Sequence, residues 1–530
     1  MRSVAENELP RTEVVTFGNS AKEITENFLI SKVGIDKDGT LFGGLTESEY
    51  DKRSQKDSLE VDFLKMRLAE IDLDKYLSLT KEDEEKLSQG KKLLEIVESK
   101  SGLDKFEKSQ GDTTLFFGQL PHWQKINLNE VEYIEILSAY FLAKVIVRTK
   151  DWFVNKYQRE LDVDNLNWCV NLGAPVQYLD SLSNARFEKV LLLARLLCED
   201  EKQLDSLKLP DLQSLCQKLK PQLKEDIQNQ DIRYKVTSEV AAGAFAYATS
   251  ISAQNGYLLY VDIGGGTTEF CYFYYQKQGS NVPEINCQNA FAPILGIEAI
   301  IHDVQLESNL DKQTIKKQLI DPDTSIVEDL DRLIIKSQKP LKQGETIAAV
   351  AKRQHQAVMT NNHQSNSYYY ITKEAIESEL KTSHTSQEKM LYELMLWERA
   401  IHLYTACKPQ EQILVGGGGK DSVFFRHCIQ STYSAFKQFN KPSTFQPKHY
   451  EIKEVSSGVK IDKNNFDMNG VNPKHFHRFA IAFGLSIPKE LTLSFKLPSQ
   501  NSIPPMPPIE ESKKPVSKVI FDAIRVVTAK

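Results

Sequence analysis

The chain has 530 residues, enough for three or four domains of about 150 residues, and its hydrophobic and charged fractions of 41% and 26% are those of a globular protein. A formal net charge of −6 argues against a general binder of nucleic acid or of anionic membranes. There is no apolar leader, no apolar run of the roughly 20 residues a membrane span needs, and no CxxC pair among seven scattered cysteines, so we expect a cytoplasmic protein with reduced thiols.

Short strands are expected at the amino-terminal end of the chain. Residues 13–18 (EVVTFG) and 28–34 are apolar segments that each end at a glycine, and residues 41–42 follow a DKDGT turn. An Asp-Gly turn between apolar runs is typical of a β-hairpin. We therefore expect three strands within residues 13–45.

A charged insertion is predicted over residues 46–130. Within it, residues 59–71 have the apolar spacing of a helix. Residues 75–110, which include KEDEEK and GKKLLEIVESK, are charged enough to form a solvated helical hairpin. We assign no chemistry to residues 75–110.

A first lobe is predicted over residues 10–258, with its core in residues 131–258. Apolar spacing there alternates between the periods of helices and strands, and one stretch is a second charged insert. The elements expected are a long helix over 131–157, a buried strand over 167–176, a helix over 183–197, the charged helical insert over 199–231 and a compact helix over 238–248.

The most informative motif is YLLYVDIGGGTTEF, residues 257–270. Its apolar run bounded by glycines predicts a strand over residues 258–263. Three glycines follow, which can reach φ > 0, so that their N–H groups could converge on an anion such as phosphate. Asp262 stands directly before them, where Mg²⁺ with its waters would lie beside phosphates. An ordinary strand–turn hairpin is the alternative interpretation.

A second lobe is predicted over residues 259–470. A strand over residues 412–415 runs into four glycines, and residues 471–495 return to the first lobe as a helix. The other expected elements are a strand over 270–275, a helix over 293–304, a smaller subdomain over 311–385, a helix over 388–407, and a proline-rich tail over 496–530 that ends in a short helix.

Alternating strands and helices, with glycine loops at strand ends, predict an α/β fold that binds ligands at the carboxyl ends of its strands. The chain contains neither GxxxxGK[ST] nor a GxGxxG after a first strand. A P-loop enzyme or a dinucleotide dehydrogenase is therefore disfavoured.

The order of the motifs resembles the nucleotide-binding domain of heat-shock protein 70, a branch of the ATPase superfamily that includes actin and the sugar kinases. The similar segments span residues 12–487 and are, in order, VVTFGNS, NWCVNLGAPV, SEVAAGAFAYA, DIGGGTTEF, LGIEAI, LVGGGG and FAIAFGLS. The resemblance implies an actin-like ATPase fold, in which two related, ribonuclease H-like domains flank a cleft for ATP and Mg²⁺.

The resemblance also implies roles for single residues. Glu239 would orient the hydrolytic water or the metal's shell, Lys65 would reach the γ-phosphate, and Asp262 would hold Mg²⁺ through water. Glu239 could instead be a first-turn carboxylate favoured by the helix dipole, and Lys65 an ordinary surface lysine. The residues that would contact the nucleotide are Gly18, Asn19, Ser20, Gly264, Gly265, Gly266, Thr267, Thr268, Gly416, Gly417, Gly418 and Lys420.

Two departures from the family pattern shape the functional hypothesis. Thr16 stands where the family has an aspartate, which removes one of two carboxylates beside Mg²⁺, and phosphoryl transfer depends on such positioning. Too few residues follow Pro488 for a peptide-binding domain. The sequence thus predicts a chaperone-related, ATP-dependent switch for a protein partner, with weak ATPase activity or none.

Three other interpretations remain open. The motif DIGGGTTE is as close to the bacterial actin-like filament proteins MreB and FtsA, although the large inserts would clutter a filament interface. A small-molecule kinase or a polyphosphate phosphatase would need an acidic base that we cannot identify. A pseudo-ATPase scaffold would be consistent with Thr16. The charged inserts and the tail are candidate surfaces for a partner.

Overall fold

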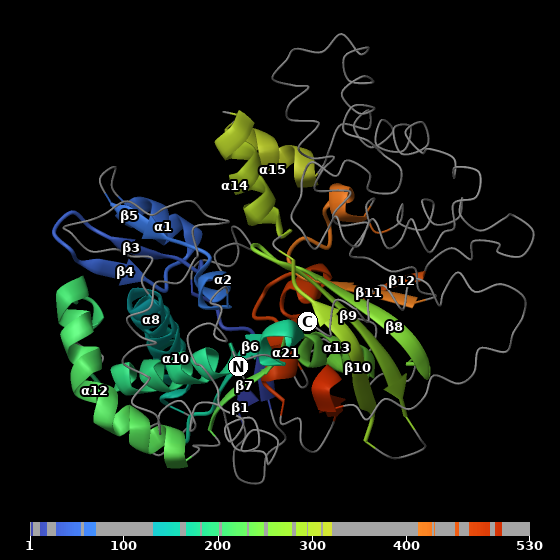
Figure 1. Ribbon diagram of the computed structural model, residues 1–530, viewed down its shortest axis with the longest axis horizontal. Helices are drawn as coiled ribbons and strands as arrows, with labels where there is room; N and C mark the ends of the chain where they lie inside the picture. The colour runs from blue at the N-terminus through green and yellow to red at the C-terminus, as the bar shows by residue number, and fades with distance from the viewer. Residues whose placement is uncertain are drawn as a thin grey trace, which may run out of the picture. The chain divides into compact units, whose positions relative to one another are not determined.

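The computed structural model describes residues 2–3, 11–17, 28–54, 58–69, 131–159, 166–180, 183–200, 204–229, 233–248, 253–277, 282–293, 295–308, 311–320, 412–426, 429, 451–454, 466–487 and 493–500. The chain forms two compact units, Met1–Ala253 with Ser456–Ser494, and Gln254–Val455 with Phe495–Lys530. The sequence had placed these boundaries at residue 258 and at residue 471. Helices and mixed sheets in both units give an α/β fold, as predicted (Figure 1).

Within its described residues, the first unit contains three small sheets, in the strand orders β1-β2-β13, β4-β3-β5 and β6-β7. Helices α8, α10 and α12 pack together beside them. The elements of this unit are β1 (Arg2–Ser3), β2 (Arg11–Glu13), β3 (Val33–Ile35), β4 (Leu41–Gly43), α1 (Glu47–Arg53), β5 (Leu59–Val61), α2 (Leu64–Ala69), α8 (Val131–Tyr157), β6 (Val170–Ala174), α9 (Val176–Leu179), α10 (Asn184–Leu197), η3 (Cys198–Asp200), α12 (Leu209–Asn229), β7 (Tyr234–Ser238), α13 (Glu239–Ala248), β13 (Phe466–Asp467), η5 (Pro473–Arg478) and α21 (Ala480–Leu485).

The hairpin between β3 and β4 is the one expected from the DKDGT turn. The amide of Asp36 donates to the carbonyl of Thr40 at 2.9 Å, and Gly39 has the positive φ of 86° that glycine tolerates. The strand predicted over residues 13–18 is wrong, because β2 ends at Glu13 and residues 14–17 are not in a strand. Of the strand predicted over residues 28–34, only Val33 and Gly34 are found in a strand, β3.

The helix predicted over residues 59–71 is wrong in its first part. Residues Leu59–Val61 form strand β5, which pairs antiparallel with β3, so Val61 is buried against the sheet and not on a helix. Phe63 has φ 52° and separates this strand from helix α2. The apolar spacing of residues 59–71 fits a helix, but residues 59–61 pair with the edge of β3 instead.

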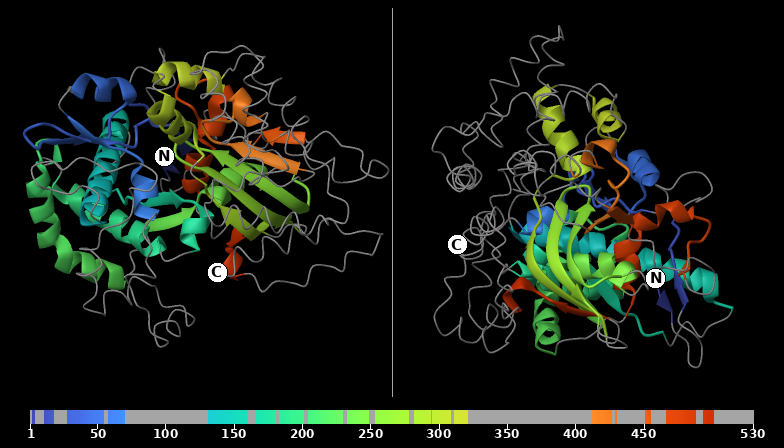
Figure 2. Two further views of the ribbon diagram at one scale, coloured as in Figure 1. Left: turned by 45° about the horizontal axis from the view of Figure 1, so that its top comes forward. Right: turned by 90° about the vertical axis from the view of Figure 1, so that its right-hand side faces the viewer.

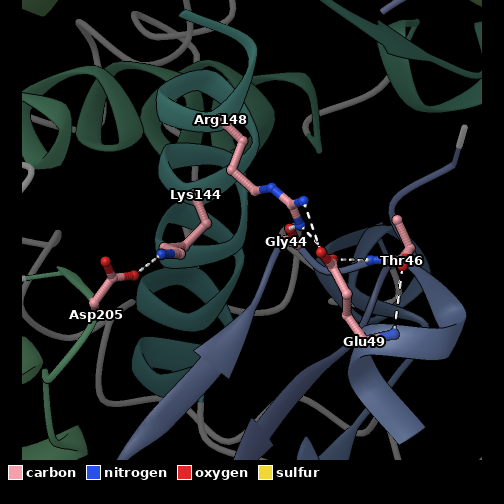
Figure 3. Close-up of polar contacts among 6 residues, drawn as sticks. All are labelled: Gly44, Thr46, Glu49, Lys144, Arg148 and Asp205. Carbon is pink, nitrogen blue, oxygen red and sulfur yellow. Dashed lines mark hydrogen bonds and ion pairs between the residues drawn. The ribbon is translucent and has the colours of Figure 1, made fainter. Parts of the chain in front are cut away.

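Helix α1 begins with a capping box and is tied to α8 by Arg148 (Figure 3). Thr46 accepts from the amide of Glu49, and the Glu49 carboxylate accepts from the amide of Thr46 at 2.9 Å. Arg148 donates to that carboxylate at 2.7 Å and to the carbonyl of Gly44 at 2.8 Å. Burial would raise the pKa of Glu49, but these hydrogen bonds outweigh it and hold the pKa below its ordinary value.

Helix α12 is not the solvated insert that its charge suggested. One face of it is buried, and its contacts are with α10 and α8. The buried side chains are Leu209, Leu212, Cys216, Leu223 and Ile227. Lys218, Lys224 and Glu225 are exposed, whereas Asp226 pairs with Arg195 of α10, so α12 is an amphipathic helix belonging to the core of the first unit.

The second unit is organised around a six-stranded sheet, in the order β12-β11-β8-β9-β10-β14 (Figures 1 and 2). Strands β8, β9 and β10 form an antiparallel meander, whereas β11 runs parallel to β8, and β12 runs parallel to β11. The elements are β8 (Gly256–Ile263), β9 (Thr268–Gln276), β10 (Glu284–Phe291), α14 (Ile297–Ser308), α15 (Lys312–Ile320), β11 (Gln412–Gly416), β12 (Glu451–Glu454), β14 (Ser494–Lys496) and η7 (Pro498–Gln500).

The predicted strands over residues 258–263 and 412–415 are confirmed as β8 and β11, and the helix over residues 293–304 as α14, which begins after Gly296. Strand β10 was not predicted, because its polar residues interrupt the apolar alternation. The predicted segment over residues 75–110, the helix over 388–407 and the tail beyond residue 500 lie outside the described residues.

The described cysteines agree with the expectation of reduced thiols. None of the five described cysteines is in a disulfide bond, and all except Cys169 are buried. Cys271 and Cys287 lie side by side on β9 and β10, and burial together with its neighbour Cys287 raises the pKa of Cys271. No helix within the described part of the chain is both long and apolar enough to cross a membrane.

Candidate functional site

The turn between β8 and β9 directs its carbonyl groups into the start of helix α14. The amides of Ile297 and Glu298 donate to the carbonyls of Gly264 and Gly265 at 3.1 and 2.8 Å, and that of Gly296 donates to Gly266 at 3.0 Å. The first N–H groups of a helix have no partner within it, and here the turn supplies one. The start of α14 is therefore occupied by the turn itself.

The amide groups of the same turn are differently placed. The amide of Gly264 donates to the carbonyl of Thr267 at 2.9 Å and closes the turn. For Gly265, Gly266 and Thr267, no acceptor of the amide N–H is found among the described residues. Gly265 is also exposed to solvent. Three backbone donors thus remain to bind an acceptor from outside the protein.

Each glycine in this region is there for a different reason. A Cβ on Gly296 would lie 2.4 Å from the carbonyl oxygen of Gly265, and one on Gly264 would lie 3.0 Å from that of Thr267. A Cβ on Gly265 would meet only Glu298, at an ordinary 3.6 Å. Packing therefore explains Gly296 and partly Gly264, but not Gly265.

The dihedral angles differ from our expectation. None of Gly264, Gly265 and Gly266 is among the glycines with positive φ, so the left-handed turn predicted for them is wrong. The carbonyls of this turn accept hydrogen bonds from the amides at the start of α14, and none of the three glycines needs a positive φ for this. Because neither packing nor dihedral angle requires glycine at position 265, the lack of a side chain there leaves the backbone open to a ligand.

Two buried carboxylates occupy paired positions of β8 and β9 beside the turn. Asp262 on β8 is directly opposite Glu269 on β9, and the two side chains are 8% and 2% exposed. The hydroxyl of Tyr260, on the same face of the sheet, donates to Asp262 Oδ1 at 3.3 Å. Two like charges in a buried setting favour a cation that neutralises them. Mg²⁺ takes one or two carboxylates together with waters and phosphate oxygens, so this pair fits it.

The second glycine loop packs against the same strand end. Gly416 at the end of β11 is paired with Asp262, and the amide of Gly419 donates to the carbonyl of Ile263 at 2.9 Å. Glycine is required at 416, where a Cβ would lie 2.7 Å from the Tyr260 hydroxyl, and at 417, which has φ 82°. Gly418 has open space around it, and Lys420 follows, half-buried. The loop thus lies at the carboxyl ends of two parallel strands.

The two predicted threonine contacts differ from each other. Thr268 is fully buried, and its hydroxyl donates to the carbonyl of Leu295 at 2.7 Å. Its side chain therefore holds the segment before α14, and the predicted role as a nucleotide contact is corrected on this point. Thr267, which is also buried, remains a candidate through its amide.

In the first unit, the structure brings together two residues that the sequence predicted separately. Lys65 Nζ donates to both carboxylate oxygens of Glu239, each at 2.9 Å, although the residues are 174 positions apart. The methylene stem of Glu239 lies so close to Gly173 that a Cβ there would be 2.8 Å from it. Lys65 is thus not an isolated surface lysine, and its ammonium group is held beside a carboxylate.

The remaining predicted positions are less informative. The hydroxyl of Thr16 accepts a hydrogen bond from the indole of Trp152 at 3.1 Å, which is compatible with a neutral residue at this position. Gly18, Asn19 and Ser20 lie outside the described residues. No group of three or more His, Cys, Asp or Glu side chains that could hold a metal was found in the part of the chain that the structure describes.

Sequence reasoning missed Tyr260, Glu269 and Glu298. For Glu269 a signal was available: a turn closed between Gly264 and Thr267 places residue 262 opposite residue 269. For Tyr260, strand alternation was a signal, because it lies two positions before Asp262 and so on the same face. For Glu298 no local signal exists, because its role depends on side-chain contacts.

No protein-family model matches the chain, and no curated protein matches it in sequence.

Proposed function

We propose that this chain binds ATP with Mg²⁺ and acts as a nucleotide-dependent switch for a protein partner, with slow hydrolysis or none. The observation that carries the proposal is the turn at Gly265–Thr267, which is exposed at Gly265 and has three amide groups without an acceptor among the described residues, next to two buried carboxylates. Backbone donors and a nearby cation site are what a polyphosphate requires. A nucleotide that binds two conformations unequally shifts their populations, which is what a switch needs.

The architecture of the second unit supports an actin-like ATPase fold. Its antiparallel meander is extended by two parallel strands, and the two glycine loops follow β8 and β11, which are neighbours in the sheet. This arrangement is compatible with a ribonuclease H-like domain. The adenosine would then lie along Gly418, where the loop is open, with Lys420 beside it.

Magnesium is the cofactor that the carboxylate pair suits. Asp262 and Glu269 would hold its water shell, and the bound ion would neutralise charge on the phosphates. Thr16 supplies no carboxylate, and its hydroxyl is already bonded to Trp152. We therefore expect the metal to be weakly positioned, so that the chain binds ATP but hydrolyses it slowly or not at all.

The test is ATP affinity with and without Mg²⁺, measured together with turnover. Wild type should bind ATP more tightly with Mg²⁺ and hydrolyse it slowly. Asp262→Asn and Glu269→Gln should each weaken binding about tenfold with Mg²⁺ present. In EDTA the same variants should bind ATP at least as well as wild type, because a negative charge has been removed. Absence of ATP binding by the wild type would rule out the switch.

Lys65 and Glu239 should affect turnover rather than affinity. The pair is partly exposed, with side chains 38% and 13% accessible, so its loss should change stability by no more than about 1 kcal/mol. We expect Lys65→Met and Glu239→Gln to lower single-turnover ATP hydrolysis about a hundredfold while Kd for ATP changes little. Lys235→Met, on the strand before Glu239, is the matched control. Unchanged turnover in both variants would leave the pair a structural one.

A further inference from the structure

A charged cluster lies directly beside the glycine turn. The side chain of Glu298 lies against Gly265, and its carboxylate binds two lysines of helix α15. Lys312 Nζ is 2.9 Å from Glu298 Oε2, and Lys316 Nζ is 3.7 Å from Oε1. Glu298 thus spans the gap between the turn and the lysines, which puts both ammonium groups within about one side chain's length of the turn.

The signs of these charges matter for an anion at the turn. A carboxylate beside Gly265 would repel a phosphate group, whereas two ammonium groups outweigh that one negative charge. The three side chains are 33 to 42% exposed, so their ion pairs are screened and worth only about 0–1 kcal/mol. Exchanging Glu298 for a phosphate as the partner of a lysine therefore costs little.

The location of Lys312 also argues against a purely stabilising role. The amide of Thr314 donates to the side chain of Asp311 at 2.9 Å, which starts helix α15 at Lys312. A cation in the first turn of a helix is disfavoured by the helix dipole. Lys316 follows four residues later and so lies on the same face of α15. A stability argument alone does not explain a lysine at position 312.

We propose that Lys312 and Lys316 bind phosphate. When a nucleoside polyphosphate binds at the turn, their ammonium groups exchange the Glu298 carboxylate for its terminal phosphates. The inference rests on the proposed function and adds to it a determinant of specificity for phosphate number. Helix α15 becomes the element that senses the phosphates, because its two lysines change partner when a polyphosphate binds. Triphosphates gain most, since they carry the most negative charge.

The test is a titration with ATP, ADP and AMP at low and at high salt. The double variant Lys312→Met, Lys316→Met should lose about tenfold or more in affinity for ATP and little for AMP, so the ATP-to-AMP preference collapses. Glu298→Gln should bind ATP more tightly than wild type. Arginine at both positions should restore the preference. Lys317→Met, on the exposed side of the same helix, should behave as wild type.

The outcomes separate the two proposals. If wild type binds none of the nucleotides, the proposed function is wrong, and this inference is wrong with it. If wild type binds ATP but the double variant keeps the same ATP-to-AMP preference, the lysines only join α14 to α15, and the proposed function stands without them. Thermal melting shows whether the double variant is folded. If it is not, Glu298→Gln, which keeps both lysines, tests the role of the lysines. Tighter ATP binding by this variant supports the inference, and unchanged binding overturns it.

Discussion

Gly265→Val is expected to weaken ATP binding about tenfold or more while the thermal midpoint of the protein stays unchanged. Gly265 is exposed, its φ is not positive, and the nearest atom to an added Cβ is Glu298 Cγ at an ordinary 3.6 Å. The fold therefore has room for valine. A ligand that approaches the amide groups of Gly265, Gly266 and Thr267 does not, because the branched side chain covers them.

The contrast with Gly296 makes this prediction sharp. A Cβ at Gly296 would lie 2.4 Å from the carbonyl oxygen of Gly265, so Gly296→Ala must move the turn away from α14. We expect that variant to lower the melting temperature and to lose nucleotide binding as a consequence. Calorimetric titration with ATP, read beside thermal melting, distinguishes the two cases. Wild-type affinity in Gly265→Val would show that the turn is not the phosphate site.

Glu135→Gln is expected to destabilise the first unit by about 3–5 kcal/mol. Glu135 on α8 is 2% exposed and accepts from Arg186 Nε at 2.7 Å and from Lys189 Nζ at 2.8 Å. Both cations are on α10 and are also buried. Without the carboxylate, two buried cations lose the negative charge that now lies between them.

Two other variants are the controls for this cluster. Arg186→Met leaves Glu135 and Lys189 as a neutral pair and should cost less than Glu135→Gln. The triple change of Glu135 to Leu and of Arg186 and Lys189 to Met removes all three charges and should recover most of the stability. Urea unfolding gives the midpoints. A single Glu135→Gln variant as stable as wild type would contradict the assignment of a charged cluster.

The same cluster predicts a dependence on pH. Burial would raise the pKa of Glu135, but Lys189 and Arg186 outweigh it, so the pKa is lowered in the folded state. The unfolded value is about 4.3, so this contribution is complete above that pH and is lost as the pH falls through the lower, folded value. Wild type should therefore lose stability below about pH 4 more steeply than the triple variant. Equal slopes in acid would argue against it.

Local features of the chain were readable from the sequence. The helices over residues 131–157 and 183–197 were confirmed as α8 and α10, with ends within one residue of the prediction. The strand before the triple glycine and the Asp-Gly hairpin were also correct. Each depends on apolar period or turn chemistry among near neighbours, which the sequence contains explicitly.

Tertiary structure alone decided the rest. Residues 59–61 became a strand because β3 had an edge to pair, and helix α12 became part of the core because α10 lay beside its apolar face. The pairing of Lys65 with Glu239 crosses 174 positions, and no periodicity connects them.

Within the candidate site, the sequence by itself identified Asp262, Gly265 and the second glycine loop as candidates, because each belongs to a strand or to the turn that ends it. Only the fold turned Thr268 towards Leu295 and set Glu298 between the turn and two lysines. The physical reason is that strand register, helix placement and charge pairing arise from contacts between segments, and a linear pattern carries no record of which segments meet.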